Sequence, residues 1–275
     1  IAAFIYKPCR GARIAGVHIE GPFINERYRG AHNRAYIRPP SIDEVDAIAD
    51  IMGKAHISVT MAPELEKASA VMDHALARGL RLSIGHTGAD YDMVMSTAKR
   101  GVISITHIFN GMKPLHHRDP SAAGAALTGP FYVELIADGI HNHPAVVDMV
   151  IKIKGIDKTI LVTDAMMATG LSDGQYELGG QKAYVKNGIA RLKEGNLAGS
   201  TLTLIRAVKN VMKFTGLPLE KALKMASLTP ARALGIDNIT GSLAVGKRAD
   251  IVILKEDLEP VLTMVAGNIV FSRAL

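Results

Sequence analysis

The segment GVISITHIFNGM, residues 101–112, decides the fold class of this chain. It is a short apolar run that leads directly into a histidine, an asparagine and a glycine. Strands buried in parallel sheets are apolar along their length, and α/β barrels keep their chemistry at the carboxyl ends of the strands. The pattern therefore predicts a buried parallel strand with His107 at its carboxyl end.

The same pattern recurs on both sides of this segment. We count six strand–helix units, and their strands end near residues 20, 62, 86, 107, 138 and 164. Ser41 and Glu44 have the spacing of a capping box, which predicts that a helix starts there. Strands that alternate with helices favour βαβ units and parallel pairing.

Two architectures fit this order of elements. A closed (β/α)8 barrel needs eight strands, so about two strand–helix units would be missing on the N-terminal side. An open doubly wound sheet needs no further strands, but it places ligands mainly at one switch point. Residues 172–198 interrupt the alternation and predict a hairpin insertion, and short β-like runs from Gly241 onward indicate part of a small β domain.

Length and composition exclude several classes of protein. Hydrophobic residues make up 48% of the 275 residues and charged residues 21%, which argues against disorder. No apolar run reaches the ~18–20 residues that a membrane span needs. The net charge of +6 is spread over the helices, which argues against nucleic-acid binding but favours an anionic substrate. Cys9 is the only cysteine and has no pattern of a nucleophile around it, so we expect no internal disulfide and a reducing, cytoplasmic location.

Four residues that can bind a metal ion or transfer a proton lie at predicted strand ends: Glu20, His86, His107 and Asp164. In a barrel these ends converge on one mouth. Two neutral imidazoles and a carboxylate suit zinc or iron, and a metal with an open position lowers the pKa of bound water. Asp164, left without a ligand role, could then accept the proton of that water.

Structural interpretations of the same residues remain open at this point. A histidine at a strand end is commonly a hydrogen-bonded structural residue, Glu20 could pair with a helix end, and Asp164 could be an N-cap. His18 alternates with Glu20 on its strand, so it could be a ligand, a support for one or part of the core. Residues 138–139 could form a plain turn, and His141 could be a surface residue.

An ordered series of motifs resembles the N-acetylglucosamine-6-phosphate deacetylases of the amidohydrolase superfamily. Each motif is weak alone, but together and in order they are specific and cover nearly the whole chain. The motifs are HIEGPF (18–23), GAHN (30–33), TMAPE (60–64), GHT (85–87), THIFNGM (106–112), DGIH (138–141), TDAM (163–166) and LAGS (197–200), followed by the superfamily tail GSLAVGKRAD (241–250).

The resemblance implies roles for single residues. Glu20, His86 and His107 match metal ligands, and Asp164 matches the catalytic acid and base. The positions that match substrate-binding residues are His32, Asn110, Gly111, Arg118 and His141. Asn110 and Gly111 match a loop that touches the sugar phosphate through backbone groups. Arg118 matches an arginine that binds phosphate in the partner subunit's site, which implies a homodimer; its planar guanidinium suits phosphate oxygens.

The resemblance also implies an overall organisation and a reaction. The fold would be a (β/α)8 TIM-like barrel over residues 1–237, with residues 238–275 contributing to a small β-sandwich. Family members carry an N-terminal segment with half of that sandwich and the first barrel strand, which this sequence does not supply. Gly111 and Arg34 stand where the family has alanine and proline.

The expected reaction is removal of the N-acetyl group from N-acetylglucosamine 6-phosphate, giving glucosamine 6-phosphate and acetate. The expected cofactor is a divalent metal, Zn2+ or Fe2+, with one or two ions. The alternatives are another amidohydrolase acting on a different amide or N-acetyl sugar, and a sugar-phosphate-binding fragment with impaired catalysis. No nucleic acid or membrane partner is expected.

Overall fold

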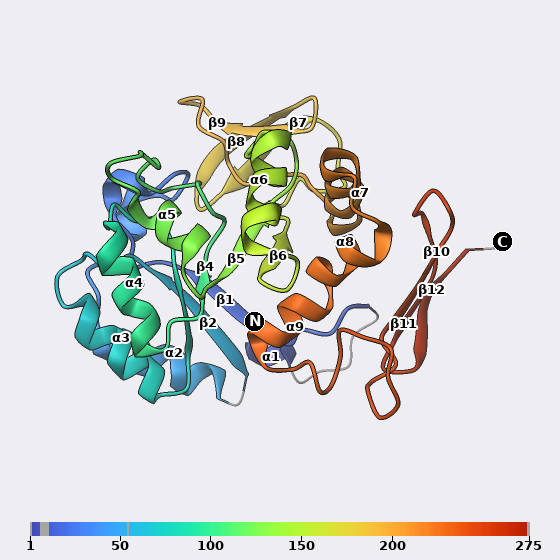
Figure 1. Cartoon of the computed structure of the whole chain (residues 1–275), viewed down its shortest axis with the longest axis horizontal. Helices are drawn as coiled ribbons and strands as arrows, with labels where there is room; N and C mark the ends of the chain where they lie inside the picture. The colour runs from blue at the N-terminus through green and yellow to red at the C-terminus, as the bar shows by residue number, and fades with distance from the viewer. Residues whose placement is uncertain (1, 6–10, 54, 274–275) are drawn as a thin grey trace.

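A six-stranded parallel sheet forms the centre of the computed structural model, which describes residues 2–5, 11–53 and 55–273 (Figure 1). The strands are β1 (Gly16–Glu20), β2 (His56–Met61), β3 (Arg81–Ile84), β4 (Ser104–Ile105), β5 (Tyr132–Ile136) and β6 (Thr159–Val162). They lie in the sheet in the same order as in the sequence. All six predicted strands are therefore present and parallel.

The strand order decides between the two predicted architectures. A doubly wound sheet reverses its strand order at a switch point, whereas a barrel adds each new strand on the same side. The order β1 to β6 has no reversal, so the sheet is of the barrel type. Within the described residues β1 and β6 pair with one neighbour each, so these six strands form an open part of a barrel wall.

Helices follow the strands and cover the sheet (Figure 1). They are α1 (Ala2–Ile5), α2 (Ile42–Met52), α3 (Ala68–Ala77), α4 (Tyr91–Arg100), α5 (Ser121–Thr128), α6 (Pro144–Lys154), α7 (Leu204–Thr215), α8 (Leu219–Ala226) and α9 (Leu228–Leu234). The main hydrophobic core joins the sheet to these helices, with Leu82, Ile105 and Leu135 among its fully buried side chains. The strands are apolar because helices and core cover them.

Two antiparallel sheets complete the fold. The predicted hairpin insertion is a three-stranded sheet of β7 (Gly174–Leu178), β8 (Gln181–Lys186) and β9 (Ile189–Leu192). The tail forms a second sheet of β10 (Ile251–Leu254), β11 (Pro260–Val265) and β12 (Asn268–Ser272), which lies at one edge of the molecule (Figure 1). A domain boundary at residue 237 stays a prediction.

Two details of the fold bear on the sequence predictions. The long loop between β1 and α2 contains two short 3-10 helices, Glu26–Tyr28 and Arg34–Tyr36, which give it a defined path. Cys9 lies outside the described residues. In the described part of the chain, every helix is too short or too polar to cross a bilayer.

Candidate active site

Three of the predicted site residues share one backbone conformation just beyond the ends of parallel strands. His86, His107 and Asp164 each lie two residues beyond the last residue of β3, β4 and β6, respectively. Their φ angles are +47°, +25° and +49°, which is the left-handed region that residues other than glycine rarely adopt. Such conformations persist where surrounding structure holds them, and they cluster at functional sites.

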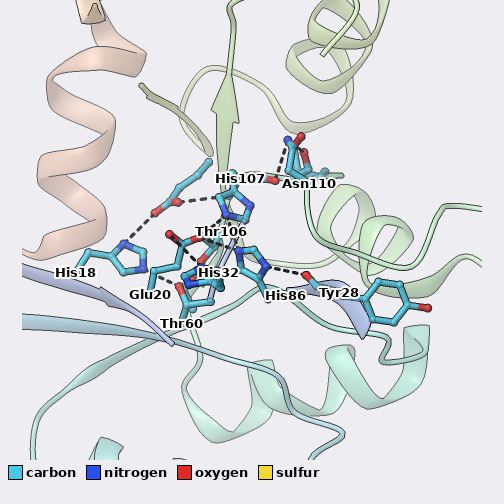
Figure 2. Close-up of polar contacts among 12 residues, drawn as sticks. His18, Glu20, Tyr28, His32, Thr60, His86, Thr106, His107 and Asn110 are labelled. Carbon is cyan, nitrogen blue, oxygen red and sulfur yellow. Dashed lines mark hydrogen bonds and ion pairs between the residues drawn. The ribbon is translucent and has the colours of Figure 1, made fainter. Parts of the chain in front are cut away.

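Glu20, His86 and His107 converge at the mouth of the sheet, as Figure 2 shows. Glu20 Oε1 lies 2.8 Å from Nε2 of His86 and 2.5 Å from Nε2 of His107. The two Nε2 atoms are 3.1 Å apart, and the two rings meet edge to face with centroids 4.8 Å apart. Residues from β1, β3 and β4 thus bring one oxygen and two nitrogens to a single point.

His32 joins this cluster from the loop that follows β1. Its Nε2 lies 3.7 Å from Glu20 Oε2, and its ring meets the His86 ring edge to face with centroids 4.7 Å apart. Ligand atoms of Glu20, His32 and His86 lie within 4.8 Å of one another, which is a spacing that a metal ion can bridge. Glu20 and His86 are therefore common to two possible ligand sets, one completed by His107 and the other by His32.

The hydrogen bond made by Nδ1 of His86 shows whether its Nε2 atom can bind a cation. His86 Nδ1 lies 2.8 Å from the carbonyl oxygen of Tyr28, which can only accept a hydrogen bond. Nδ1 therefore carries the proton in the neutral ring, and the Nε2 lone pair points at the Glu20 carboxylate. Lone pairs of nitrogen and oxygen facing each other at 2.8 Å require a cation or a proton between them. Histidine ligands of metals characteristically donate their other N–H to such a carbonyl, so the donor set fits a metal ion.

The electrostatics of the cluster agree with a site for positive charge. Burial alone would raise the pKa of Glu20, but its interactions with the side chains of His107, His32 and His86 outweigh burial and hold the pKa well below its ordinary value. Burial lowers the pKa of His86. Burial acts in the same direction on His107, but the Glu20 carboxylate outweighs it and raises the pKa of His107 to about 9. The protein alone therefore keeps Glu20 ionised and a proton on His107.

A cavity of about 730 Å³ opens above the cluster. The predicted site residues that line it are Glu20, His32, His86, His107, Asn110, Gly111, His141 and Asp164. Burial raises the pKa of the Asp164 carboxyl. A carboxylate with a raised pKa beside a cation site is suited to accept a proton and return it.

Besides His32, three of the predicted substrate-binding residues lie at the cavity wall. Asn110 folds its side-chain amide back onto the carbonyl oxygens of His107 and Ile108, at 3.2 and 3.0 Å. Gly111 has φ +57°, and a Cβ there would lie 2.5 Å from Nδ1 of His86, so glycine allows the close approach. His141 reaches the wall from the loop that follows β5.

Arg118 lies outside the cavity of its own chain. It is exposed in the tight turn of residues 116–119, where its Nη1 lies 2.8 Å from Nε2 of His117. The structure therefore brings together eight of the nine predicted site residues and leaves Arg118 apart from them.

Three carboxylates that were not predicted as site residues bind groups of the site or of the loops that carry it. Asp138 pairs with His141, and Glu134 Oε2 accepts a hydrogen bond of 3.4 Å from the backbone N–H of His107. Glu64 accepts hydrogen bonds from Asn25, from the Thr87 hydroxyl and from the Gly88 N–H, at 2.8, 2.5 and 2.6 Å. Position near a strand end and membership of a quoted motif were the signals for Asp138 and Glu64, whereas Glu134 lies inside β5 and gave none.

His18, whose role was left open, supports the site. Its Nε2 lies 2.7 Å from the Thr60 hydroxyl, which lies 2.8 Å from the Thr106 hydroxyl. Thr106 in turn donates to Ser83 at 2.6 Å. The His18 ring and three buried hydroxyl groups therefore link β1, β2, β3 and the end of β4, and Figure 2 shows His18, Thr60 and Thr106 of this chain beside the cluster.

Comparisons with known proteins find a family model and relatives that cover nearly all of the chain. The model of the Amidohydrolase family matches residues 9–270. N-acetylglucosamine-6-phosphate deacetylase from Vibrio furnissii is 42% identical over 265 residues, which are 96% of this chain and 66% of the relative. N-acetylgalactosamine-6-phosphate deacetylase from Escherichia coli O157:H7 is 37% identical over 260 residues, 94% of this chain and 69% of the relative. The chain thus spans about two thirds of the length of these curated relatives.

Solved structures share the fold at similar coverage. N-acetylglucosamine-6-phosphate deacetylase from Thermotoga maritima has a TM-score of 0.88 at 42% identity, over 94% of this chain and 70% of its own. A mutant of N-acetyl-D-glucosamine-6-phosphate deacetylase from Mycobacterium smegmatis, in complex with N-acetyl-D-glucosamine-6-phosphate, has a TM-score of 0.90 at 36% identity, over 94% of this chain and 69% of its own.

Proposed function

The chain belongs to the amidohydrolase family, and from this premise we propose that it removes the N-acetyl group from N-acetylglucosamine 6-phosphate. The observation that carries the proposal is the convergence of Glu20, His86 and His107 beneath a cavity that Asp164 also lines. The products would be glucosamine 6-phosphate and acetate.

We propose Glu20, His86 and His107 as the ligands of one divalent metal ion, Zn2+ or Fe2+, and a second ion remains open. We assign the third position to His107 rather than to His32, because His107, like His86, lies just past a strand end in a left-handed backbone conformation, whereas His32 lies in the loop after β1. Imidazole and carboxylate ligands suit zinc and iron. A metal bound there would supply Lewis-acid polarisation of the acetyl carbonyl and activation of a water molecule.

Asp164 moves the protons of the reaction in this proposal. Its carboxylate accepts a proton from the water that attacks the acetyl carbon. The protonated acid then gives this proton to the amide nitrogen, so that the amine leaves as a neutral group. Burial raises the pKa of Asp164, which makes its carboxylate a stronger base for the first transfer than an exposed aspartate would be.

His32, Asn110, Gly111 and His141 would hold the sugar phosphate at the cavity wall. Arg118 does not line this cavity in its own chain, which supports the proposal that it reaches the site of a second copy in a homodimer. We propose that the six parallel strands form part of a (β/α)8 barrel and that the tail forms part of a small β-sandwich. The single cysteine supports a reducing compartment such as the cytoplasm.

The second candidate substrate is N-acetylgalactosamine 6-phosphate, the C4 epimer. The relative from Escherichia coli O157:H7 that carries this substrate in its name is 37% identical, close to the values for the glucosamine relatives. The ratio of kcat/KM for the two epimers decides between them.

Acetate release from N-acetylglucosamine 6-phosphate tests the proposal. The assay compares the protein as purified, after chelation, and after readdition of zinc or iron. We expect release that is lost on chelation and restored by one of the two metals. Binding of the sugar phosphate without release under any metal would instead support the impaired fragment.

A further inference from the structure

Asp138 and His141 form a closed polar pair in the loop that follows β5. Asp138 Oδ2 lies 2.6 Å from Nδ1 of His141, and the two side chains are 6% and 7% exposed. The other oxygen, Oδ1, accepts hydrogen bonds from the backbone N–H groups of Ile140 and His141, both at 2.8 Å. Both oxygens of Asp138 are thus occupied by residues of its own loop.

This pairing fixes the proton on the His141 ring. Burial opposes ionisation of Asp138, but the hydrogen bonds from His141 and from the backbone outweigh it and lower the pKa of the carboxyl. An ionised carboxylate only accepts hydrogen bonds, so Nδ1 of His141 is the protonated nitrogen. In the neutral ring Nε2 then carries a lone pair, and the ring lies at the cavity wall together with Asp164.

The loop itself is held in place on both sides. The side-chain amide of Asn142 donates to the Ile136 carbonyl at 3.0 Å, and that of Asn210 in α7 donates to the Ala137 carbonyl at 2.8 Å. Gly139 has φ +77°, and a Cβ there would lie 3.3 Å from the Phe214 ring. His141 therefore has little freedom to move or rotate relative to the cavity.

We propose that Asp138 is a positioning residue that holds His141 in the tautomer whose Nε2 accepts a hydrogen bond from an O–H or N–H group of the amino sugar. The proposal rests on the proposed function, since the donor belongs to that substrate. Asp138 does not touch the substrate; it determines which atom of His141 does so, and in which hydrogen-bonding state.

The substitution Asp138→Asn reverses this arrangement for a structural reason. The two backbone N–H groups at the Oδ1 position can only donate, so the asparagine must keep its carbonyl oxygen there. Its NH2 group then faces Nδ1 of His141 and donates to it. The neutral ring must carry its proton on Nε2, and the cavity receives a donor where it had an acceptor.

Nitrogen-15 NMR of the histidine rings tests the tautomer directly. His141 is assigned as the signal that disappears in His141→Gln. We expect the neutral His141 ring to be protonated at Nδ1 in the unaltered protein and at Nε2 in Asp138→Asn. The same tautomer in both proteins, or an Nε2 proton in the unaltered one, overturns the proposal.

Steady-state kinetics then test whether the tautomer of His141 affects substrate binding. We expect Asp138→Asn to lower kcat/KM by roughly tenfold or more, mainly through KM, because the bound sugar loses one hydrogen bond and meets a mismatched donor. The double variant with His141→Gln should be no worse than His141→Gln alone, since both changes remove one interaction. Metal content should not change, and Asp148→Asn, which alters a half-buried carboxylate paired with the exposed Lys152, serves as the matched control.

Additive losses, or an effect no larger than that of Asp148→Asn, would contradict the positioning role. The two proposals fail separately. A protein that releases no acetate contradicts the proposed function, while the tautomer and the calorimetric affinity for glucosamine 6-phosphate still decide the role of Asp138.

Discussion

Nδ1 of His86 donates a hydrogen bond of 2.8 Å to the carbonyl oxygen of Tyr28, so the opposite nitrogen of the ring faces Glu20 with a lone pair. A backbone group in the loop after β1 therefore sets the hydrogen-bonding state of a side chain at the end of β3. The neighbouring His107 differs, because its pKa of about 9 keeps it protonated at neutral pH without a metal.

Metal binding should release a proton from His107. The ion needs the lone pair that the proton occupies below a pKa of about 9, so we expect release of about one proton per ion at pH 7.5. Calorimetric zinc titrations in buffers of different ionisation enthalpy measure this number. His107→Ala should bind zinc more weakly and without the release; a metal uptake that is independent of the buffer contradicts the assignment.

Asp164→Asn should lower kcat by roughly 10²- to 10⁴-fold, which is the usual contribution of a general acid and base. The amide can neither accept nor return the proton, but it keeps the shape of the side chain. Zinc content and affinity for the product should be retained. Asp148→Asn is the control, and a kcat within twofold of that control would exclude Asp164 as the proton carrier.

The pH dependence of kcat/KM should show an acid limb from Asp164. Because burial raises the pKa of this carboxyl, activity should fall below a pH that is higher than the ordinary aspartic acid range.

In the metal-free protein the raised pKa of Asp164 should also make the free energy of unfolding depend on pH. The folded state binds the proton more tightly, so the free energy of unfolding should decrease as pH rises from the ordinary pKa to the raised one. Urea titrations across this window should show the decrease for the unaltered protein and lack it for Asp164→Asn.

Glu64→Ala should destabilise the protein by about 1–3 kcal/mol, because three donors from two loops lose their common acceptor. Glu64→Gln should be milder, since its carbonyl oxygen can still accept from Asn25 and Gly88 while its NH2 group donates to the Thr87 hydroxyl. Urea unfolding of the two variants measures the difference. Equal stability of the alanine and glutamine variants would show that Glu64 does not hold the two loops together.

Arg118→Ala should raise KM for the phosphorylated sugar by roughly ten- to hundred-fold, the effect of losing a charge-assisted hydrogen bond. Activity on N-acetylglucosamine, which has no phosphate, should change little. Arg78→Ala, which removes a surface guanidinium paired with Asp46 and Asp50, is the matched control. Sedimentation at assay concentrations should also show a dimer; a monomer with a full Arg118 effect would refute transfer of this arginine between copies.

Much of the sheet could be predicted from sequence because the strands are mainly apolar and several helices begin or end at a recognisable residue. Ser41 illustrates this, since its hydroxyl accepts the Glu44 N–H as expected. The second half of the predicted capping box is different, because the Glu44 carboxylate binds Arg38 instead. No specific prediction covered α5, whose small residues are buried on nearly all sides and therefore show no helical periodicity.

The candidate site could likewise be predicted only in part. The convergence of Glu20, His86 and His107 follows from the parallel strand order, although their role as ligands stays a prediction. The side chains that support these residues could not be predicted, because the support depends on contacts between segments that are far apart in the sequence. Glu134 is one example: its neighbours in β5 are apolar, and nothing near it in sequence indicates that it lies behind His107.

Three of the reactive groups project from positions two residues past the ladder of the sheet, in a backbone conformation of their own. The regular pairing of the parallel strands therefore ends before the positions that carry these side chains. Replacing a side chain at such a position alters the reaction without altering strand register, and inserting a residue further along lengthens a loop without shifting a strand. This separation makes the scaffold a convenient starting point for redesign, in which new ligands or proton carriers are introduced at the turn positions alone.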